Sequence, residues 1–161
     1  MRVLGIDPGY GRMGVALVET RSTKSEARNG EPVLLHSDCL ETSAGEFDER
    51  LGELMARLET LTKLWKPDRL ALERLFFNTN QKTAMRVAEV RGAVIALSQR
   101  LGLETREYTP QEVKVAVTGY GKAAKKDVAS MLKKLLGVKK VVKHDDEYDA
   151  MAVALTSIVS R

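Results

Sequence analysis

Apolar residues along this chain follow two different spacings, and the change between them comes near residue 45. Residues 2–7, 13–20 and 33–41 are short stretches rich in Val, Leu and Ile, which predicts three strands. The Pro-Gly-Tyr-Gly segment between the first two strands predicts a tight hairpin. Residues 21–32 are polar and rich in turn formers, so they are expected to form an exposed loop.

From residue 46 onward, apolar residues recur three and four positions apart. This spacing predicts an amphipathic helix over residues 46–65, which Pro67 ends. Further helices are expected at 80–101, 109–119, 124–136 and 145–160, with strands at 69–74 and 103–107. Three strands in succession, followed by alternating helices and strands, predict an α/β fold. Its core would be one mixed five-stranded sheet with helices on both faces.

The long helix at 80–101 is apolar on more than one side. Such a helix is buried either in the core of its own chain alone, or against the sheet on one side and a second subunit on the other. The apolar pattern fits both arrangements.

Composition narrows the class of protein. The chain has 161 residues, 43% hydrophobic and 30% charged, which is expected of one soluble globular domain over 1–161. No apolar stretch is long enough to cross a bilayer, and the N-terminus lacks a secretory pattern, so a cytoplasmic protein is expected. The single cysteine, Cys39, excludes an intrachain disulfide and a cysteine zinc cage, and is expected to be a core or sheet thiol.

The net charge of +4 is modest, but the positive charge is concentrated in one region. Between Lys114 and Lys143 there are nine lysines and one acid, Asp127. Such an excess is compatible with contacts to nucleic-acid phosphates, and also with an ordinary solvated helix face.

Four carboxylates lie at the ends of predicted elements. Asp7 ends the first strand and opens a Pro-Gly turn, Glu73 ends the fourth strand, and Asp146 and Asp149 begin the last helix. Mg²⁺ prefers hard oxygen ligands, usually a few carboxylates together with substrate phosphate oxygens. Two such ions about 3.5–4 Å apart can activate water and stabilise the leaving oxygen in phosphodiester cleavage. The pattern therefore predicts a Mg²⁺-dependent enzyme that cuts a polyanion.

Each carboxylate also has a simpler explanation. Asp7 could cap amides of its own turn, Glu73 could be a surface acid, and acids in a first helical turn interact favourably with the helix dipole. Asp145 and Asp146 both share a helix face with Asp149, so spacing does not choose between them. His144 could add a metal ligand or be a bystander.

Four segments together resemble the RuvC family of bacterial Holliday-junction resolvases. They are Leu4-Gly5-Ile6-Asp7-Pro8-Gly9, Leu72-Glu73-Arg74-Leu75-Phe76-Phe77-Asn78-Thr79-Asn80, Ala88-Glu89-Val90-Arg91-Gly92 and Asp146-x-x-Asp149-Ala150-x-Ala152. The resemblance runs from residue 3 to about 157, with the motifs in the order and spacing of the family. The chain departs from the family pattern in its longer polar loop at 21–32, in Arg74, and in the extra acids Asp145 and Glu147.

The resemblance implies an RNase H-like fold, a homodimer, and paired symmetric nicks in opposed strands of four-way DNA junctions during recombination and repair. It implies Mg²⁺ as cofactor, with Mn²⁺ as a substitute and two ions per site when DNA is bound. By resemblance, the catalytic and metal-binding residues are Asp7, Glu73, Asp146 and Asp149. The Asp-x-x-Asp-Ala spacing of the family selects Asp146 over Asp145. The implied DNA contacts are Phe76, Lys114, Lys122, Lys125 and Lys126. Docking of a branch-migration motor is left open.

Three other functions fit parts of the pattern. A non-catalytic junction-binding protein would be expected to lack at least one of the four carboxylates, and all four are present. A sugar-kinase-like or actin-like ATPase would need a second phosphate hairpin and a longer chain. An RNase H-like nuclease acting on RNA is disfavoured only by the motif resemblance.

Overall fold

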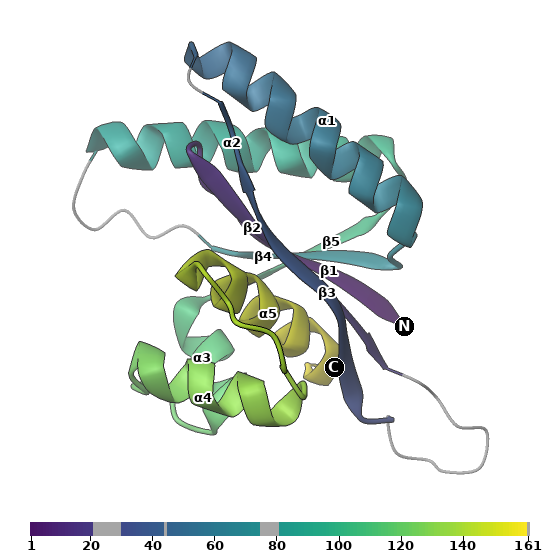
Figure 1. Ribbon diagram of the computed structural model, residues 1–161, viewed down its shortest axis with the longest axis vertical. Coiled ribbons are helices and arrows are strands. Elements are labelled where there is room, and N and C mark those ends of the chain that lie inside the picture. Colours follow the sequence, from purple (N-terminus) through teal and green to yellow (C-terminus); the bar gives the residue numbers. More distant parts are fainter. Residues whose placement is uncertain (21–29, 44, 75–80, 161) are drawn as a thin grey trace.

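A five-stranded mixed sheet forms the centre of the computed structural model, which describes residues 1–20, 30–43, 45–74 and 81–160 (Figure 1). The strands are β1 (Arg2–Asp7), β2 (Arg12–Thr20), β3 (Pro32–Glu41), β4 (Arg69–Glu73) and β5 (Glu104–Tyr108), in the spatial order β3-β2-β1-β4-β5. The first three strands pair antiparallel, whereas β4 pairs parallel with both β1 and β5. The predicted hairpin and mixed sheet are therefore confirmed. Most of the loop predicted at 21–32 lies outside the described residues.

Helices cover both faces of the sheet, as predicted. They are α1 (Phe47–Trp65), α2 (Gln81–Arg100), α3 (Pro110–Thr118), α4 (Lys125–Leu135) and α5 (Asp145–Val159). Figure 1 shows α1 and α2 on one face and α3, α4 and α5 on the other. Each lies within two residues of its expected bounds, because caps and periodicity define helix ends locally. At α3, for example, the Thr109 hydroxyl accepts a hydrogen bond from the Glu112 amide in a capping box.

Alternation along each strand divides the core into two layers. In β1, Leu4 and Ile6 pack with α1 and α2, whereas Val3 packs with α3, α4 and α5. The same division holds in β4, where Leu70 and Leu72 belong to the first layer and Ala71 to the second. The strand-end acids Asp7 and Glu73 follow Ile6 and Leu72, so the alternation directs their side chains toward α5.

The long helix α2 buries one side against the sheet through Val90, Val94 and Leu97. On its other side Met85 is 64% exposed. Core burial thus accounts for only part of the apolar surface of this helix. In the described part of the chain, no helix is both long enough and apolar enough to span a membrane.

Cys39 lies in β3, opposite Gly14 of β2, as a free thiol. Burial, together with the negative charge of Asp146, raises the pKa of this thiol to about 11. The cysteine is therefore a protonated sheet residue rather than a reactive thiolate.

Candidate active site

Asp7 and Glu73 end neighbouring parallel strands on the same edge of the sheet. Ile6 pairs with Leu72 across β1 and β4, so continuing the register by one residue brings Asp7 beside Glu73. Parallel strands end at the same edge, which is where ligands bind in open α/β sheets. Two acids that lie 66 positions apart in the sequence are thereby brought together.

Two glycines, Gly5 in β1 and Gly14 in β2, allow the start of α5 to lie directly on the sheet. A Cβ atom on Gly5 would lie 2.1 Å from the backbone oxygen of Ala150, and one on Gly14 would lie 2.0 Å from that of Asp146. Both distances are far shorter than van der Waals contact, so any side chain at either position would displace the helix. The first turn of α5 therefore reaches the edge that carries Asp7 and Glu73.

A pocket opens at this junction of β1, β4, α3, α4 and α5. Its acidic lining consists of Asp7, Glu73, Asp145 and Asp149, and its basic lining of Lys114 and Lys125. Apolar side chains and Tyr148 complete the walls. Three of the four carboxylates proposed from the sequence thus line one pocket, together with two of the proposed DNA-contacting lysines.

Negative charge is concentrated in this pocket. Burial, together with the negative charges of Asp149, Asp146 and Glu73, raises the pKa of Asp7 to about 7. Burial and Asp149 also raise the pKa of Glu73, whereas Lys125 and Lys114 lower it. A raised carboxyl pKa means that the site holds more negative charge than its environment stabilises. A bound cation would relieve this imbalance.

Lys125 supplies part of the compensating charge from the start of α4. Its Nζ lies 3.2 Å from Asp149 Oδ2, and its side chain is 76% exposed. The Asp149 charge raises the pKa of Lys125, so the lysine stays protonated. An exposed lysine can change partners easily, because a solvated ion pair contributes only about 0–1 kcal/mol.

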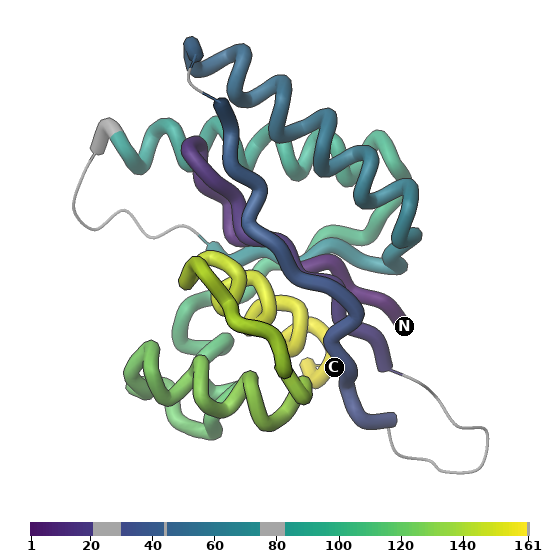
Figure 2. Tube along the Cα trace, in the orientation of Figure 1, coloured from purple at the N-terminus to yellow at the C-terminus, as the bar shows by residue number. Residues whose placement is uncertain are grey.

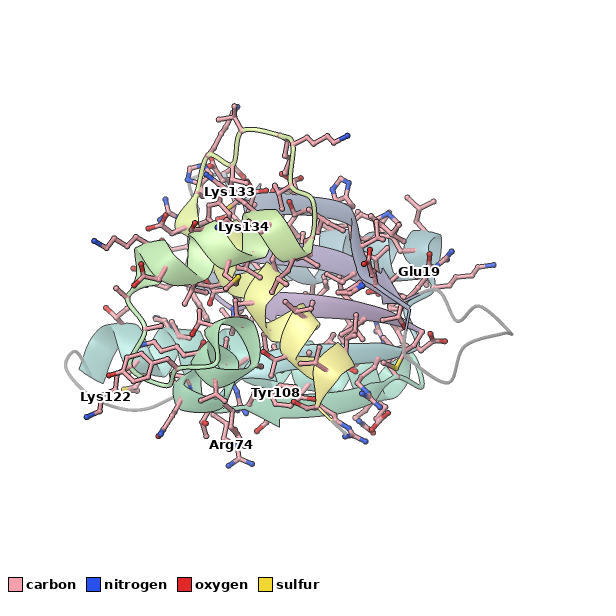
Figure 3. All side chains as sticks on the ribbon, turned by 90° about the horizontal axis from the view of Figure 1, so that it is seen from below. Glu19, Arg74, Tyr108, Lys122, Lys133 and Lys134 are labelled. Atoms are coloured by element: carbon pink, nitrogen blue, oxygen red, sulfur yellow. The ribbon has the colours of Figure 1, made fainter. Side chains whose placement is uncertain are left out.

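The other proposed DNA contacts lie outside the pocket or outside the described residues. Lys122 and Lys126 are exposed and do not line the pocket. Figure 3 shows Lys122 directed outward, and Lys133 and Lys134 on α4. Phe76 lies outside the described residues.

One lysine of the basic run has a structural role instead. Lys140 Nζ lies 2.5 Å from Glu147 Oε2 and 2.5 Å from the backbone oxygen of Ser37. Glu147 is 4% exposed and also accepts a hydrogen bond of 2.9 Å from the Ser37 hydroxyl. These contacts tie the α4–α5 link to β3, and Figure 2 shows the two segments side by side. They also fix the rotation of α5 about its axis.

This rotation separates Asp146 from the pocket. Asp145 and Asp149 line it, whereas Asp146 Oδ2 lies 2.8 Å from Arg12 Nε at the start of β2. That oxygen is buried and accepts no hydrogen bond from any residue that the structure describes, so the contact is an ion pair without hydrogen-bond geometry. His144 is directed away from the pocket lining, with Nε2 2.8 Å from Glu41 Oε1.

The pocket suits a divalent cation in chemistry and charge. Its donors are carboxylate oxygens, it carries excess negative charge, and the buried Asp146 oxygen beside it lacks a hydrogen-bond partner. Across the residues the structure describes, however, no three acidic, histidine or cysteine side chains converge into a ready-made ligand set. Binding an ion would therefore require rotation of the carboxylates.

Arg12 and Tyr148 lie at the site but were not predicted from the sequence. Tyr148 lines the pocket, and the Lys133 ammonium lies 5.7 Å from its ring centroid. Neither residue belongs to a recognisable motif. The strand pairing places Arg12 opposite Glu41, but its contact with Asp146 depends on how α5 docks, which periodicity does not reveal.

Comparison with known proteins supports the family resemblance over almost the whole chain. The family model for crossover junction endodeoxyribonuclease RuvC matches residues 3–157. The chain is 42% identical to the crossover junction endodeoxyribonuclease RuvC of Moorella thermoacetica over 156 residues, covering 96% of this chain and 89% of that protein.

Solved structures of RuvC proteins support the same family assignment. RuvC of Thermus thermophilus is similar with a TM-score of 0.84 and 33% identity, covering 97% of this chain and 92% of that one. The same protein in complex with a Holliday junction substrate gives a TM-score of 0.86 at 33% identity, over 97% and 92% of the two chains. The fold is therefore RNase H-like, as the resemblance implied. The chain belongs to the RuvC family of crossover junction endodeoxyribonucleases.

Proposed function

We propose that this protein resolves four-way DNA junctions by hydrolysing one phosphodiester bond in each of two opposed strands. The observation that carries the proposal is the convergence of Asp7, Glu73 and Asp149 on one pocket in a chain of this family. The relative from Thermus thermophilus was solved in complex with a Holliday junction substrate, which supports the same substrate here. We place the reaction in DNA recombination and repair, in the cytoplasm.

Divalent metal use follows from the family and the fold, and we propose Mg²⁺ as the natural ion with Mn²⁺ as a substitute. The residues that would hold it are Asp7, Glu73 and Asp149, with Asp146 as a fourth ligand after a side-chain rotation. Two ions bound together with DNA would supply an activated water and stabilise the leaving oxygen during in-line displacement.

The lysines of the pocket position the substrate and stabilise charge. Lys114 and Lys125 are the cations lining the pocket, next to the acids where a scissile phosphate would lie. Lys125 is paired with Asp149, and a phosphate could take over this lysine when metal neutralises the acid. Its ammonium would then stabilise the extra negative charge that develops on the phosphoryl oxygens. Lys122, Lys126 and Phe76 are proposed to contact the junction outside the pocket.

Paired nicks require two active sites, and we propose a homodimer. Met85, on the outward side of α2, is an apolar side chain that the core of the single chain leaves exposed. A symmetric dimer would present two identical pockets to the two-fold symmetric junction. Size-exclusion chromatography with light scattering tests this directly, and a monomer at micromolar concentration would contradict it. A branch-migration motor as a further partner remains a prediction.

The activity is tested with purified protein, Mg²⁺ and three substrates of equal length: a synthetic four-way junction, a linear duplex and a structured RNA. Symmetric nicks in opposed strands of the junction are expected, with neither control substrate cut. The Asp7→Asn variant should bind the junction without cutting it. Equal cutting of all three substrates would contradict junction specificity, and preferential cutting of the RNA would support an RNase H-like ribonuclease instead.

A further inference from the structure

Arg12 lies in the middle of a row of polar contacts beside the candidate site, between His144 and Asp146. Its Nη1 lies 3.4 Å from Nδ1 of His144, whose Nε2 contacts Glu41 on β3. Its Nε lies 2.8 Å from Asp146 Oδ2, in a pair whose side chains are 50% and 22% exposed. The guanidinium is therefore held between the sheet edge and the first turn of α5, where it faces Asp146.

The backbone of Asp146 has little freedom to move. Its carbonyl oxygen packs directly over Gly14, where even a Cβ atom would lie 2.0 Å away. The next residue, Glu147, is buried and bonded to Ser37 and Lys140. The backbone of Asp146 is therefore fixed, and only its side chain can rotate between Arg12 and the pocket.

The pair with Arg12 leaves Asp146 incompletely satisfied. Oδ2 is buried and accepts no hydrogen bond within the described part of the chain, although an ionised carboxylate can accept several. A buried carboxylate with an unsatisfied oxygen is close to the state of a ligand that lacks its ion. Arg12 is the cation closest to it among the ion pairs of the described residues.

We propose that Arg12 holds the Asp146 carboxylate beside β2, outside the pocket of Asp7, Glu73 and Asp149, so that a divalent cation must compete with Arg12 for this ligand. The inference rests on the proposed function for the nature of that cation. Arginine stays charged at all accessible pH values, so it both neutralises Asp146 and repels an incoming ion. Arg12 is thus a positioning residue that lowers the cation affinity of the DNA-free protein.

The test is a Mn²⁺ titration of the DNA-free protein, with free Mn²⁺ measured by electron paramagnetic resonance. Arg12→Gln should bind Mn²⁺ about three- to tenfold more tightly than the wild type, because it releases Asp146 and removes a nearby positive charge. Arg12→Lys keeps the charge and should stay near the wild-type affinity. In an Asp146→Asn background, the gain from Arg12→Gln should fall by at least half.

Arg2→Gln is the matched control. It also removes one positive charge and one ion pair, with Glu19, but Arg2 lies at the opposite end of β1 from Asp7. Its Mn²⁺ affinity should equal that of the wild type. Thermal unfolding of each variant confirms that the chain is folded before titration.

Two results would overturn the inference. One is an Arg12→Gln variant that binds Mn²⁺ no more tightly than the wild type, including no measurable binding by either. The other is an equal gain in Mn²⁺ affinity with and without Asp146, since Arg12 would then act only through its charge.

The junction assay distinguishes failure of the proposed function from failure of the role proposed for Arg12. If the wild type binds Mn²⁺ but leaves junctions intact, the proposed function fails. If it cuts them while Arg12→Gln gains no affinity, only the role of Arg12 fails.

Discussion

The two faces of the sheet are packed with side chains of different size, and only one of them can carry the chemistry. Toward α1 and α2 the first two strands present large side chains: Leu4, Ile6, Met13, Val15 and Leu17. Toward α5 they present Val3 and Val18 at the end far from Asp7 but Gly5, Gly14 and Ala16 nearer to it, and the residues that α5 contributes include Ala150, Ala152 and Ala154. Large side chains hold helices away from a sheet, whereas glycine and alanine let backbones approach.

The difference explains the location of the site. Asp7 and Glu73 follow buried strand residues and are directed to the α5 face, where the acidic first turn of that helix meets them. The α1–α2 face holds a mainly apolar layer and stabilises the sheet. Four predictions follow from the contrast between these faces, and they differ in whether activity or stability is lost.

The largest expected effect is on catalysis. Asp7→Asn keeps the size of the side chain but removes the charge at the centre of the acidic pocket. We expect junction cleavage to fall by on the order of 10³-fold, as when one essential electrostatic contact is removed from an active site. Rates are measured under single-turnover conditions with Mg²⁺. Cleavage within tenfold of the wild type would show that Asp7 is not a ligand.

Gly14→Val should disrupt the α5 face by forcing the helix away from β2. Its first side-chain carbon alone would lie 2.0 Å from the Asp146 backbone oxygen. We expect a loss of about 3 kcal/mol or more in the free energy of unfolding, measured by urea denaturation, together with loss of cleavage.

Gly52→Ala is the matched control for that substitution. Gly52 lies in α1, where a Cβ atom would meet nothing within 4 Å. Replacing a helical glycine with alanine in open space should raise the free energy of unfolding by about 0.5–1 kcal/mol. Equal destabilisation by both substitutions would contradict the close approach of α5.

Leu58→Ala, on the α1 face, should lower stability and leave the active site unchanged. Leu58 is fully buried in the layer between the sheet and α1. Its truncation should lower the free energy of unfolding by about 2–5 kcal/mol through the cavity that it leaves. At temperatures where the variant is still folded, its Mn²⁺ affinity should match that of the wild type. A tenfold weaker affinity would show that the two faces are coupled.

The smallest expected effect is a pH dependence of stability in the metal-free protein. Folding raises the pKa of Asp7 from 3.8 to about 7, so the folded state binds this proton more tightly than the unfolded chain. The contribution of Asp7 to the free energy of unfolding therefore increases as the pH falls from 8 to 5.5, by about 2 kcal/mol. In Asp7→Asn this contribution should be absent, and saturating Mn²⁺ should suppress it in the wild type. Identical pH profiles for wild type and Asp7→Asn in chelator would contradict the raised pKa.

Most of the fold could be predicted from the sequence because its signals are local. Strand alternation, helical periodicity, and punctuation such as Pro67 and the Thr109 cap each act over a few residues. The strand-end positions of Asp7 and Glu73 followed from the same patterns. Their placement beside each other needed only the parallel pairing of β1 with β4.

The details around α5 could not be predicted, because they depend on how the helix docks. Residues three and four apart share a helix face, so spacing left Asp145 and Asp146 equivalent. The burial of Glu147 and its contact with Lys140 fix the rotation that brings Asp145 to the pocket and Asp146 to Arg12. Because Lys140 is bonded to Glu147, it is not free to bind DNA. A count of lysines therefore overstates the positive surface available to DNA.

The most direct test of junction resolution uses a supercoiled plasmid that extrudes a cruciform, together with a matched plasmid without the inverted repeat. With Mg²⁺ and wild-type protein, paired nicks at the four-way junction should convert the cruciform plasmid to the linear form and leave the other plasmid supercoiled. Accumulation of singly nicked circles without linear product, or equal cutting of both plasmids, would contradict the proposed activity.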